Sequence, residues 1–178
     1  MTTILKIILV SFFLLLFGCK NEPSLQKYFV ENTENKNFSS IDVTPKMLNI
    51  DSKKLSVDQK NSLRSFEKIN VLAFKINDTN KKDFLTEKSK VALILKNKIY
   101  QQLFKFGSGT DGAQVSFVGT DENIEEFVIY VNRKENGFAL IRVLGDKMNP
   151  THIMNIMTSL QSANMNLDQL KPFLDQLK

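Results

Sequence analysis

The sequence has few of the side chains that carry most protein chemistry. It contains one cysteine, one histidine, no tryptophan and three arginines in 178 residues. A single cysteine cannot form a disulfide within the chain, and with a single imidazole it cannot complete a four-ligand zinc site. The fold must therefore be stabilised by its own apolar core, and we predict no metal ligand, no catalytic residue and no cofactor-binding residue.

The charge pattern does not indicate nucleic-acid binding. The 24 basic and 19 acidic residues leave a net charge of +5, and lysines scattered along the chain supply most of the positive charge. Proteins that bind nucleic acid instead concentrate lysine and arginine on one face, beside aromatic side chains that stack on bases. We interpret these lysines as a solvated surface and predict no nucleic-acid partner.

The most distinctive stretch that is present is an apolar run at the start of the chain. Residues 1–18 have the parts of an export signal peptide: a positive charge at Lys6, then an apolar stretch and a small residue, Gly18, before Cys19. The apolar stretch is shorter than the roughly 20 residues that span a bilayer. An uncleaved membrane anchor is the alternative, and the Gly18-Cys19 pair at the end of the run favours cleavage instead.

The last residues of this region, Leu16-Phe17-Gly18-Cys19, resemble the lipobox of bacterial lipoproteins. In that family the cysteine thiol takes a diacylglycerol, the chain is cut just before the cysteine, and the new amine is acylated with a fatty acid such as palmitate. The resemblance implies a protein of the bacterial cell envelope, anchored through lipid on Cys19, with the outer membrane as the expected location. The next residues, Lys20-Asn21-Glu22, resemble signals that send lipoproteins to the cell surface. An ordinary polar spacer is an equal alternative, so the face of the membrane stays open.

Removal of the signal peptide leaves 178 − 18 = 160 residues. This length is enough for one domain with a core, and no repeat or linker rich in Gly, Pro or Ser divides it. Residues 19–36 are mostly polar and are predicted to form the lipid-anchored tether, with a short helix from Ser24. Residues 37–178 are predicted to form a single α+β domain.

Helices and strands alternate in the first half of this domain. Ser56 and Gln59 form a capping box, which predicts the start of a helix, and the turn residues at 77–80 precede a long amphipathic helix. The elements predicted here are a strand at 38–43, a short turn after Pro45, a helix at 57–68, a buried strand at 71–76 and a helix at 81–98.

From Leu103 the apolar residues alternate with a period of two, which indicates strands. Strands are predicted at 103–106, 114–118, 126–132 and 138–144, followed by a helix after Asn149-Pro150 and an amphipathic segment after Asn166. Asn136-Gly137 predicts a hairpin turn, because both residues tolerate positive φ. The whole pattern predicts a two-layer α+β sandwich, with helices packed on one face of a mostly antiparallel sheet.

Several segments of the second half resemble a known family. They are Tyr100-Gln101-Gln102-Leu103 ahead of a glycine-rich turn, Val115-Ser116-Phe117, Glu126-Phe127-Val128-Ile129, and Leu140-Ile141-Arg142-Val143-Leu144-Gly145-Asp146 before a helix. Together with the lipobox, the size and the order of elements, they are similar to bacterial lipoproteins of the domain-of-unknown-function family 4252. The resemblance implies an α+β envelope lipoprotein without an established activity, and it transfers no catalytic or binding residue.

Two groups of residues invite a chemical interpretation. Gly107, Gly109 and Gly112 spell G-x-G-x-x-G, but a strand follows them instead of the helix that a dinucleotide site needs, so a hairpin loop is predicted. Acids in neighbouring loops could bind Ca²⁺ or act as a carboxylate pair: Asp111, Asp121, Glu122, Glu125 and Glu126. No EF-hand spacing is present, and solvated turn acids are the simpler interpretation.

Three further features have a plain and a functional interpretation. His152 is interpreted as a surface histidine, because the chain has no G-x-S-x-G elbow and offers no thiol partner. The lysines of the helix at 81–98 could rest on anionic lipid headgroups, but Asp83 and Glu87 interrupt them and favour a solvated helix face. A partner groove could be lined by the C-terminal methionines, although core filling is commoner: Met148, Met154, Met157 and Met165.

Three functional hypotheses follow. The leading one is an envelope lipoprotein of unknown molecular function, whose domain is a non-enzymatic binding or structural module with another envelope protein as its candidate partner. One alternative is a small envelope glycan hydrolase, which requires two facing carboxylates among Asp111, Asp121, Glu125 and Glu126. The other is a small-ligand capture protein, which requires an apolar cavity between helix and sheet. The sequence identifies no small-molecule substrate.

Overall fold

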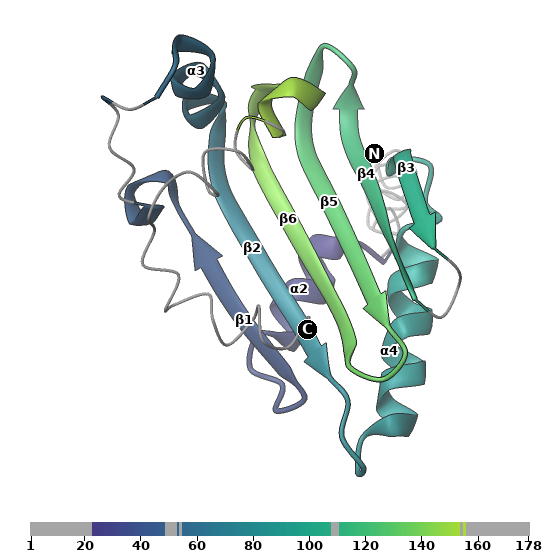
Figure 1. Ribbon diagram of the computed structural model, residues 1–178. Coiled ribbons are helices and arrows are strands. Elements are labelled where there is room, and N and C mark those ends of the chain that lie inside the picture. The colour runs from purple at the N-terminus through teal and green to yellow at the C-terminus, as the bar shows by residue number, and fades with distance from the viewer. Residues whose placement is uncertain (1–22, 49–52, 54, 108–110, 154, 156–178) are drawn as a thin grey trace, which may run out of the picture.

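The computed structural model describes residues 23–48, 53, 55–107, 111–153 and 155. Its centre is a six-stranded sheet with the strand order β1-β2-β6-β5-β4-β3, in which every neighbouring pair is antiparallel (Figure 1). The strands are β1 (Phe38–Val43), β2 (Phe66–Lys75), β3 (Gln101–Gly107), β4 (Gly112–Thr120), β5 (Asn123–Arg133) and β6 (Gly137–Met148). The predicted meander of the second half is therefore confirmed, and each of its strands is longer than predicted.

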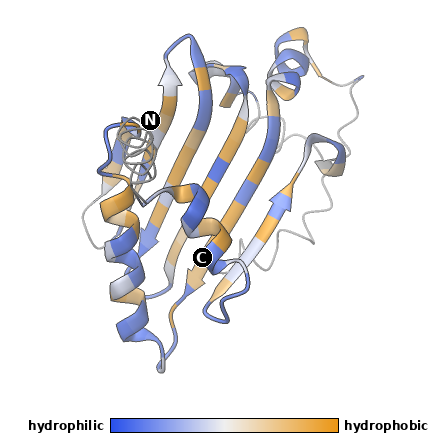
Figure 2. Ribbon diagram, turned by 180° about the vertical axis from the view of Figure 1, so that it is seen from behind, coloured by the Kyte–Doolittle hydropathy of each residue, from blue (hydrophilic) through white to orange (hydrophobic). Residues whose placement is uncertain are grey.

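Two helices lie on one face of this sheet, which Figure 2 shows from the helix side. They are α2 (Leu25–Asn32) and α4 (Lys81–Ile94), whereas α3 (Val57–Ser65) lies at one end of the sheet and the 3-10 helix η2 (Pro45–Leu48) follows β1. This arrangement confirms the predicted α+β sandwich. No helix in the described part of the chain is long and apolar enough to cross a membrane.

Helix α2 belongs to the folded core, although the sequence analysis assigned its residues to the tether. Ser24 caps the helix by accepting a hydrogen bond from a backbone amide of the first turn. Leu25, Tyr28 and Phe29 are buried against the sheet, and the Leu25 amide donates a hydrogen bond to the Tyr100 hydroxyl at 3.2 Å. The folded part therefore includes most of the stretch at 19–36 that was predicted to be a tether.

The boundary between α3 and β2 lies earlier than predicted. The capping box at the start of α3 is present, but the helix ends at Ser65 instead of residue 68. Phe66 and Ile69 are buried in the same apolar cluster, and a bulge between Phe66 and Lys68 brings them to one face of the strand. Their spacing of three therefore suits a bulged strand as well as a helix. Helix α4 likewise ends at Ile94, short of the predicted residue 98.

The turn between β5 and β6 shows why its sequence is so specific. Gly137 has φ +127°, and a Cβ atom there would collide with the carbonyl oxygen of Phe74 on the neighbouring strand. The Asn136 carbonyl also accepts a hydrogen bond from the Ile76 amide at 3.0 Å. The hairpin predicted at Asn136-Gly137 is confirmed, and only glycine fits its second position without strain.

The sheet separates two apolar clusters. The cluster beneath α2 and α4 is rich in aromatic rings, and Phe38 and Phe74 meet edge to face with their centroids 5.1 Å apart. The cluster on the opposite face contains Phe66, Phe117 and Phe127 with aliphatic neighbours. Each apolar face of the sheet must be shielded from water. Helices α2 and α4 shield one of the two faces.

Candidate functional site

A cleft of about 380 Å³ lies between α4 and the edge half of the sheet. Its helix wall is formed by Lys88 and Ala92, and its sheet wall by side chains from β3, β4 and β5, among them Lys105, Gln114 and Tyr130. These strand residues alternate with side chains of the opposite face, so they point to the helix side. Ligand pockets commonly measure about 300–1,000 Å³, so the cleft has room for a small molecule.

The walls of this cleft carry positively charged side chains. Three lysines line it: Lys88 from α4, Lys96 just after the end of α4, and Lys105 from β3. None of the described lining residues is acidic. The Lys88 ammonium lies 5.8 Å from the centre of the Phe84 ring, which orients that side chain. Lysines that converge on a partly apolar cleft raise its potential and attract an anion.

Tyr130 supplies an unsatisfied polar group beside the same cleft. Its hydroxyl is buried and has no hydrogen-bond partner in the described part of the chain. Burial raises the pKa of Tyr130 to about 12, so the hydroxyl stays protonated near neutral pH and can donate a hydrogen bond. A buried hydroxyl without a partner costs stability, and such costs are common at binding sites.

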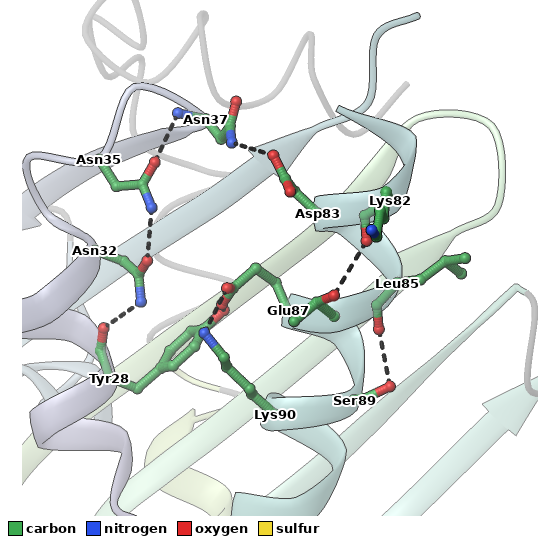
Figure 3. A network of polar contacts seen from close by, with 11 residues as sticks. Tyr28, Asn32, Asn35, Asn37, Lys82, Asp83, Leu85, Glu87, Ser89 and Lys90 are labelled. Atoms are coloured by element: carbon green, nitrogen blue, oxygen red, sulfur yellow. Dashed lines mark hydrogen bonds and ion pairs between the residues drawn. The ribbon is translucent and has the colours of Figure 1, made fainter. Parts of the chain in front are cut away.

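A polar network joins α4, the helix that forms one wall of the cleft, to α2 (Figure 3). The Tyr28 hydroxyl of α2 donates a hydrogen bond to Glu87 Oε2 at 2.8 Å, and the Lys90 ammonium lies 2.7 Å from Glu87 Oε1. Burial, and then the hydrogen bond to Glu87, raise the pKa of Tyr28 well above its usual range. The buried carboxylate of Glu87 therefore has two partners and holds α4 against α2.

A second buried ion pair ties α2 to the sheet. Arg142 donates hydrogen bonds from Nε and Nη2 to the two carboxylate oxygens of Glu126, at 2.8 and 2.9 Å, and from Nη1 to Gln26 of α2 at 2.8 Å. The guanidinium also lies over the Phe29 ring, 5.3 Å from its centre. These contacts of Arg142 are all with side chains of α2 and β5. We therefore assign Glu126 and Arg142 to the stabilisation of the fold and not to a catalytic site.

The acids that the sequence suggested as a cluster do not form one group, because Asp111 lies far from the other four. Asp111 lies at the β3–β4 end of the sheet, where its Oδ1 accepts a hydrogen bond from the Lys134 amide at 3.0 Å. Asp121 and Glu122 are exposed at the opposite end of the nine-residue strand β4, and Glu125 is exposed on β5. At about 3.3 Å per residue the ends of β4 are roughly 26 Å apart. Within the described residues, no group of three or more His, Cys, Asp or Glu side chains could hold a metal ion.

The glycines and His152 also have structural explanations. Gly107 has φ +74° and pairs with Gly112 at the end of the β3–β4 hairpin, as predicted, while Gly109 lies outside the described residues. His152 is half-buried, with its Nδ1 2.9 Å from the Ser65 hydroxyl. The same hydroxyl donates a hydrogen bond to the backbone carbonyl of Ser62 at 2.8 Å, so the contact with His152 joins the chain after β6 to α3.

Some of the remaining candidate residues have structural roles, and the others lie outside the described residues. Lys81 pairs with Asp78 at 3.1 Å on the solvated side of α4. Met148 is fully buried in the cluster opposite the helices, which confirms a core role for that residue. Outside the described residues lie Cys19, Lys20-Asn21-Glu22, Met154, Met157 and Met165.

Sequence reasoning did not find the cleft, because its lysines come from separate elements and none of them stands in a motif. The comparisons with known proteins leave its ligand open as well. A family model described as a domain of unknown function (DUF4252) matches residues 28–156. No curated protein and no solved structure matches the chain.

Proposed function

The chain belongs to the DUF4252 family, whose function is unknown, and we propose that it is a non-enzymatic binding protein of the bacterial envelope. In this proposal acylated Cys19 anchors the chain in a membrane, and the cleft between α4 and the sheet captures a small anion with an apolar part. The observation that carries the proposal is the cleft itself: three lysines and no acidic side chain among its described lining residues.

The chemistry of the lining favours a ligand that is both charged and apolar. Lys96 and Lys105 are exposed at the mouth, where they can meet a carboxylate, sulfate or phosphate group. Ala92, which is exposed, and the less exposed Leu95 and Tyr130 supply apolar surface to the cleft. Pockets of this kind bind ligands by burying their apolar part while a few polar groups fix the orientation.

The proposed anchor would keep this cleft close to a membrane. Helix α2 begins at Leu25, six residues after Cys19, and a chain of six residues extends over at most about 20 Å. A protein held at that distance samples molecules at or near the membrane surface. The proposal therefore combines the anchored binding module with the small-ligand capture that the sequence left as an alternative.

The hydrolase hypothesis receives less support from the geometry. It requires two carboxylates that face each other across a cleft, at about 5–10 Å. Asp111 and Asp121 lie at opposite ends of β4, and Glu126 is held by Arg142. A binding role requires only a lined cleft, which the described residues provide.

Ligand titrations test the cleft. The chain with Cys19→Ala, which removes the acylation site, is titrated with a fluorescent fatty acid and with its neutral methyl ester. Each exposed ion pair contributes about 0.2–1 kcal/mol, so we expect the acid to bind about twofold to thirtyfold more weakly to the Lys96→Gln, Lys105→Gln double variant. The ester should bind both proteins equally.

A matched control removes the same charge elsewhere. Lys36 and Lys46 are exposed near the opposite edge of the sheet, so Lys36→Gln with Lys46→Gln should leave the affinity for the acid unchanged. Equal binding of acid and ester, or equal loss in both double variants, would contradict the cleft as the anion site.

A further inference from the structure

The face of the sheet opposite α2 and α4 presents three cross-strand rows without a charged residue. The central row, read across all six strands, is Ile41, Val71, Ile141, Ile129, Val115 and Phe104. The rows on either side are Val43, Ile69, Val143, Phe127, Phe117 and Gln101, and Ser39, Ala73, Ala139, Val131, Ala113 and Phe106. Sixteen of these eighteen residues are apolar, with Ser39 and Gln101 as the exceptions. We call these three rows the open face.

The helix-covered face of the sheet carries the polar side chains, and the face without helices is apolar. This is the reverse of the usual arrangement, in which the face exposed to water is the polar one. The buried polar side chains Asn70, Ser116 and Arg142 all lie on the helix-covered face, where they alternate with residues of the open face. In an antiparallel sheet with one face in water, the polar residues normally line the wet face. A contiguous apolar surface across six strands indicates a binding partner instead.

The described residues cover only one end of the open face. Leu63 of α3 and Ile153 of the helical turn at 150–153 pack into its apolar cluster near Phe66 and Met148. No described helix lies over the middle of the face, as Figure 1 shows. Phe127 and Ala139 in the middle of the face are nevertheless buried. Among the residues of the three rows, the exposed ones all lie on the edge strand β3, where Phe104 and Phe106 are 41% and 62% exposed and Phe106 also lines the cleft.

The chain passes the covered end of this face just before its C-terminal segment. His152 contacts the Ser65 hydroxyl at 2.9 Å, and the Asn155 amide group donates a hydrogen bond to the Ser62 hydroxyl at 3.1 Å. These two contacts hold His152 and Asn155 against α3. Asn155, the last described residue before the segment at 156–178, therefore lies at the covered end of the open face, where Ile153 is buried.

We infer that residues 156–178 of the same chain dock on the open face through their apolar side chains. The segment has 178 − 155 = 23 residues, which would extend about 35 Å as a helix at 1.5 Å per residue. The eleven residues of β5 extend over a similar length, about 36 Å at 3.3 Å per residue. The segment is therefore long enough to follow the strands over their full length, and at a diameter of about 10 Å it would cover about two of them.

The chemistry of the segment matches the face. Its apolar residues recur every three or four positions along one stripe: Ile156, Leu160, Ala163, Leu167, Leu170, Leu174 and Leu177. Its acids, Asp168 and Asp175, lie off this stripe, as does Pro172, and Lys171 and Lys178 border it. An apolar stripe with a charged outer side is what an uncharged sheet face needs as its cover.

Thiol labelling tests this inference, because the chain has a single native cysteine. In the full chain with Cys19→Ala, Ile129→Cys places one thiol in the central row of the open face, and Leu85→Cys places one on α4, where Leu85 is 63% exposed. If the segment covers the face, a maleimide should label position 129 at least about tenfold more slowly than position 85. Adding Leu170→Asp and Leu174→Asp should bring the two rates together, whereas Gln169→Asp and Gln176→Asp, off the stripe, should not.

The other outcomes identify a different cover. Labelling at position 129 could also be slow because a second copy of the chain covers the face. In that case the rate would rise on dilution and would not change with Leu170→Asp and Leu174→Asp, and the inference would be overturned. Equal fast labelling at both positions in the unsubstituted segment would show that nothing covers the face. Because the aspartates could unfold the domain, a short bifunctional maleimide joining Ile129→Cys to Leu170→Cys provides a second test. A crosslink within one chain supports the inference, and none, or one only between chains, refutes it.

Discussion

The buried guanidinium of Arg142 joins helix α2 to the sheet and depends on one carboxylate for its charge balance. Replacing Glu126 with glutamine leaves the shape of the side chain but removes that charge, so Arg142 remains buried without a counterion. Breaking a buried pair in this way typically costs about 3–5 kcal/mol. We expect Glu126→Gln to lower the free energy of unfolding in urea by roughly 3 kcal/mol, and Glu125→Gln, at its exposed neighbour, by less than about 0.5 kcal/mol.

The same substitution at two tyrosines should have opposite effects. Tyr28 donates its hydroxyl hydrogen to the Glu87 carboxylate, and Tyr130 has a buried hydroxyl without a partner in the described residues. Tyr28→Phe should therefore reduce the free energy of unfolding by about 1.5–3 kcal/mol, whereas Tyr130→Phe should leave it unchanged or raise it by up to roughly 1 kcal/mol. Thermal melts of the two variants distinguish these outcomes, and an equal loss in both would contradict the described bonding.

The raised pKa values of these tyrosines also predict a response to alkali. A tyrosine whose pKa is higher in the folded than in the unfolded state contributes stability that is complete below the unfolded value, about 10. That contribution is lost as the pH rises through the folded value, which is about 12 for Tyr130. We expect the urea midpoint to fall between about pH 10 and 12, and to fall less steeply in Tyr28→Phe than in wild type. If the urea midpoints of the two proteins fall in parallel with pH, Tyr28 does not contribute to the loss of stability in alkali.

At the scale of secondary-structure elements, the β5–β6 hairpin supports a prediction about the backbone. Alanine at position 137 would require a φ that L-residues rarely adopt, and its Cβ would meet the Phe74 carbonyl oxygen. Strain of this kind costs about 1–3 kcal/mol, so Gly137→Ala should lower the unfolding midpoint clearly. Glu135→Ala, at an exposed residue of the same turn, provides the control and should have little effect.

The same hairpin shows which elements sequence alone could predict. The strands of the meander alternate apolar and polar residues and are separated by recognisable turns, so their order and pairing follow from local pattern. The boundary at Phe66 could not be predicted, because a bulge makes a strand imitate helical spacing. A short helix from Ser24 was predicted, but its place in the core was not, because its burial depends on partners 75 and 116 residues away, Tyr100 and Arg142.

The candidate cleft was beyond prediction for a related reason. Lys88 and Lys105 lie on different elements, and only the packing of α4 on the sheet brings them to one cleft. In the sequence each lysine is indistinguishable from the others of a lysine-rich surface. What the sequence did provide was the requirement for a cavity between helix and sheet, which is where the cleft lies.

At the scale of the whole molecule, the central expectation is the lipid on Cys19. If Cys19 is acylated, the protein should partition with membranes, because each buried methylene of an acyl chain contributes about 0.8 kcal/mol and several chains together anchor stably. We expect Cys19→Ala to move the protein to the soluble fraction and to remove the mass of the lipid, as measured by fractionation and mass spectrometry. Lys20→Ala, at the next residue, should remain in the membrane.

The same strains decide which side of the membrane the cleft serves. Protease added to intact cells would remove a surface-exposed protein and spare a periplasmic control, so loss of the wild-type chain would indicate capture of ligands from outside the cell. Survival until lysis would instead restrict the ligand to molecules of the periplasm. If Cys19→Ala changes neither the fraction nor the mass, the anchor is wrong. The lysine-lined cleft would then have to be explained without a nearby membrane, and only the titrations with Lys96→Gln and Lys105→Gln would still bear on its function.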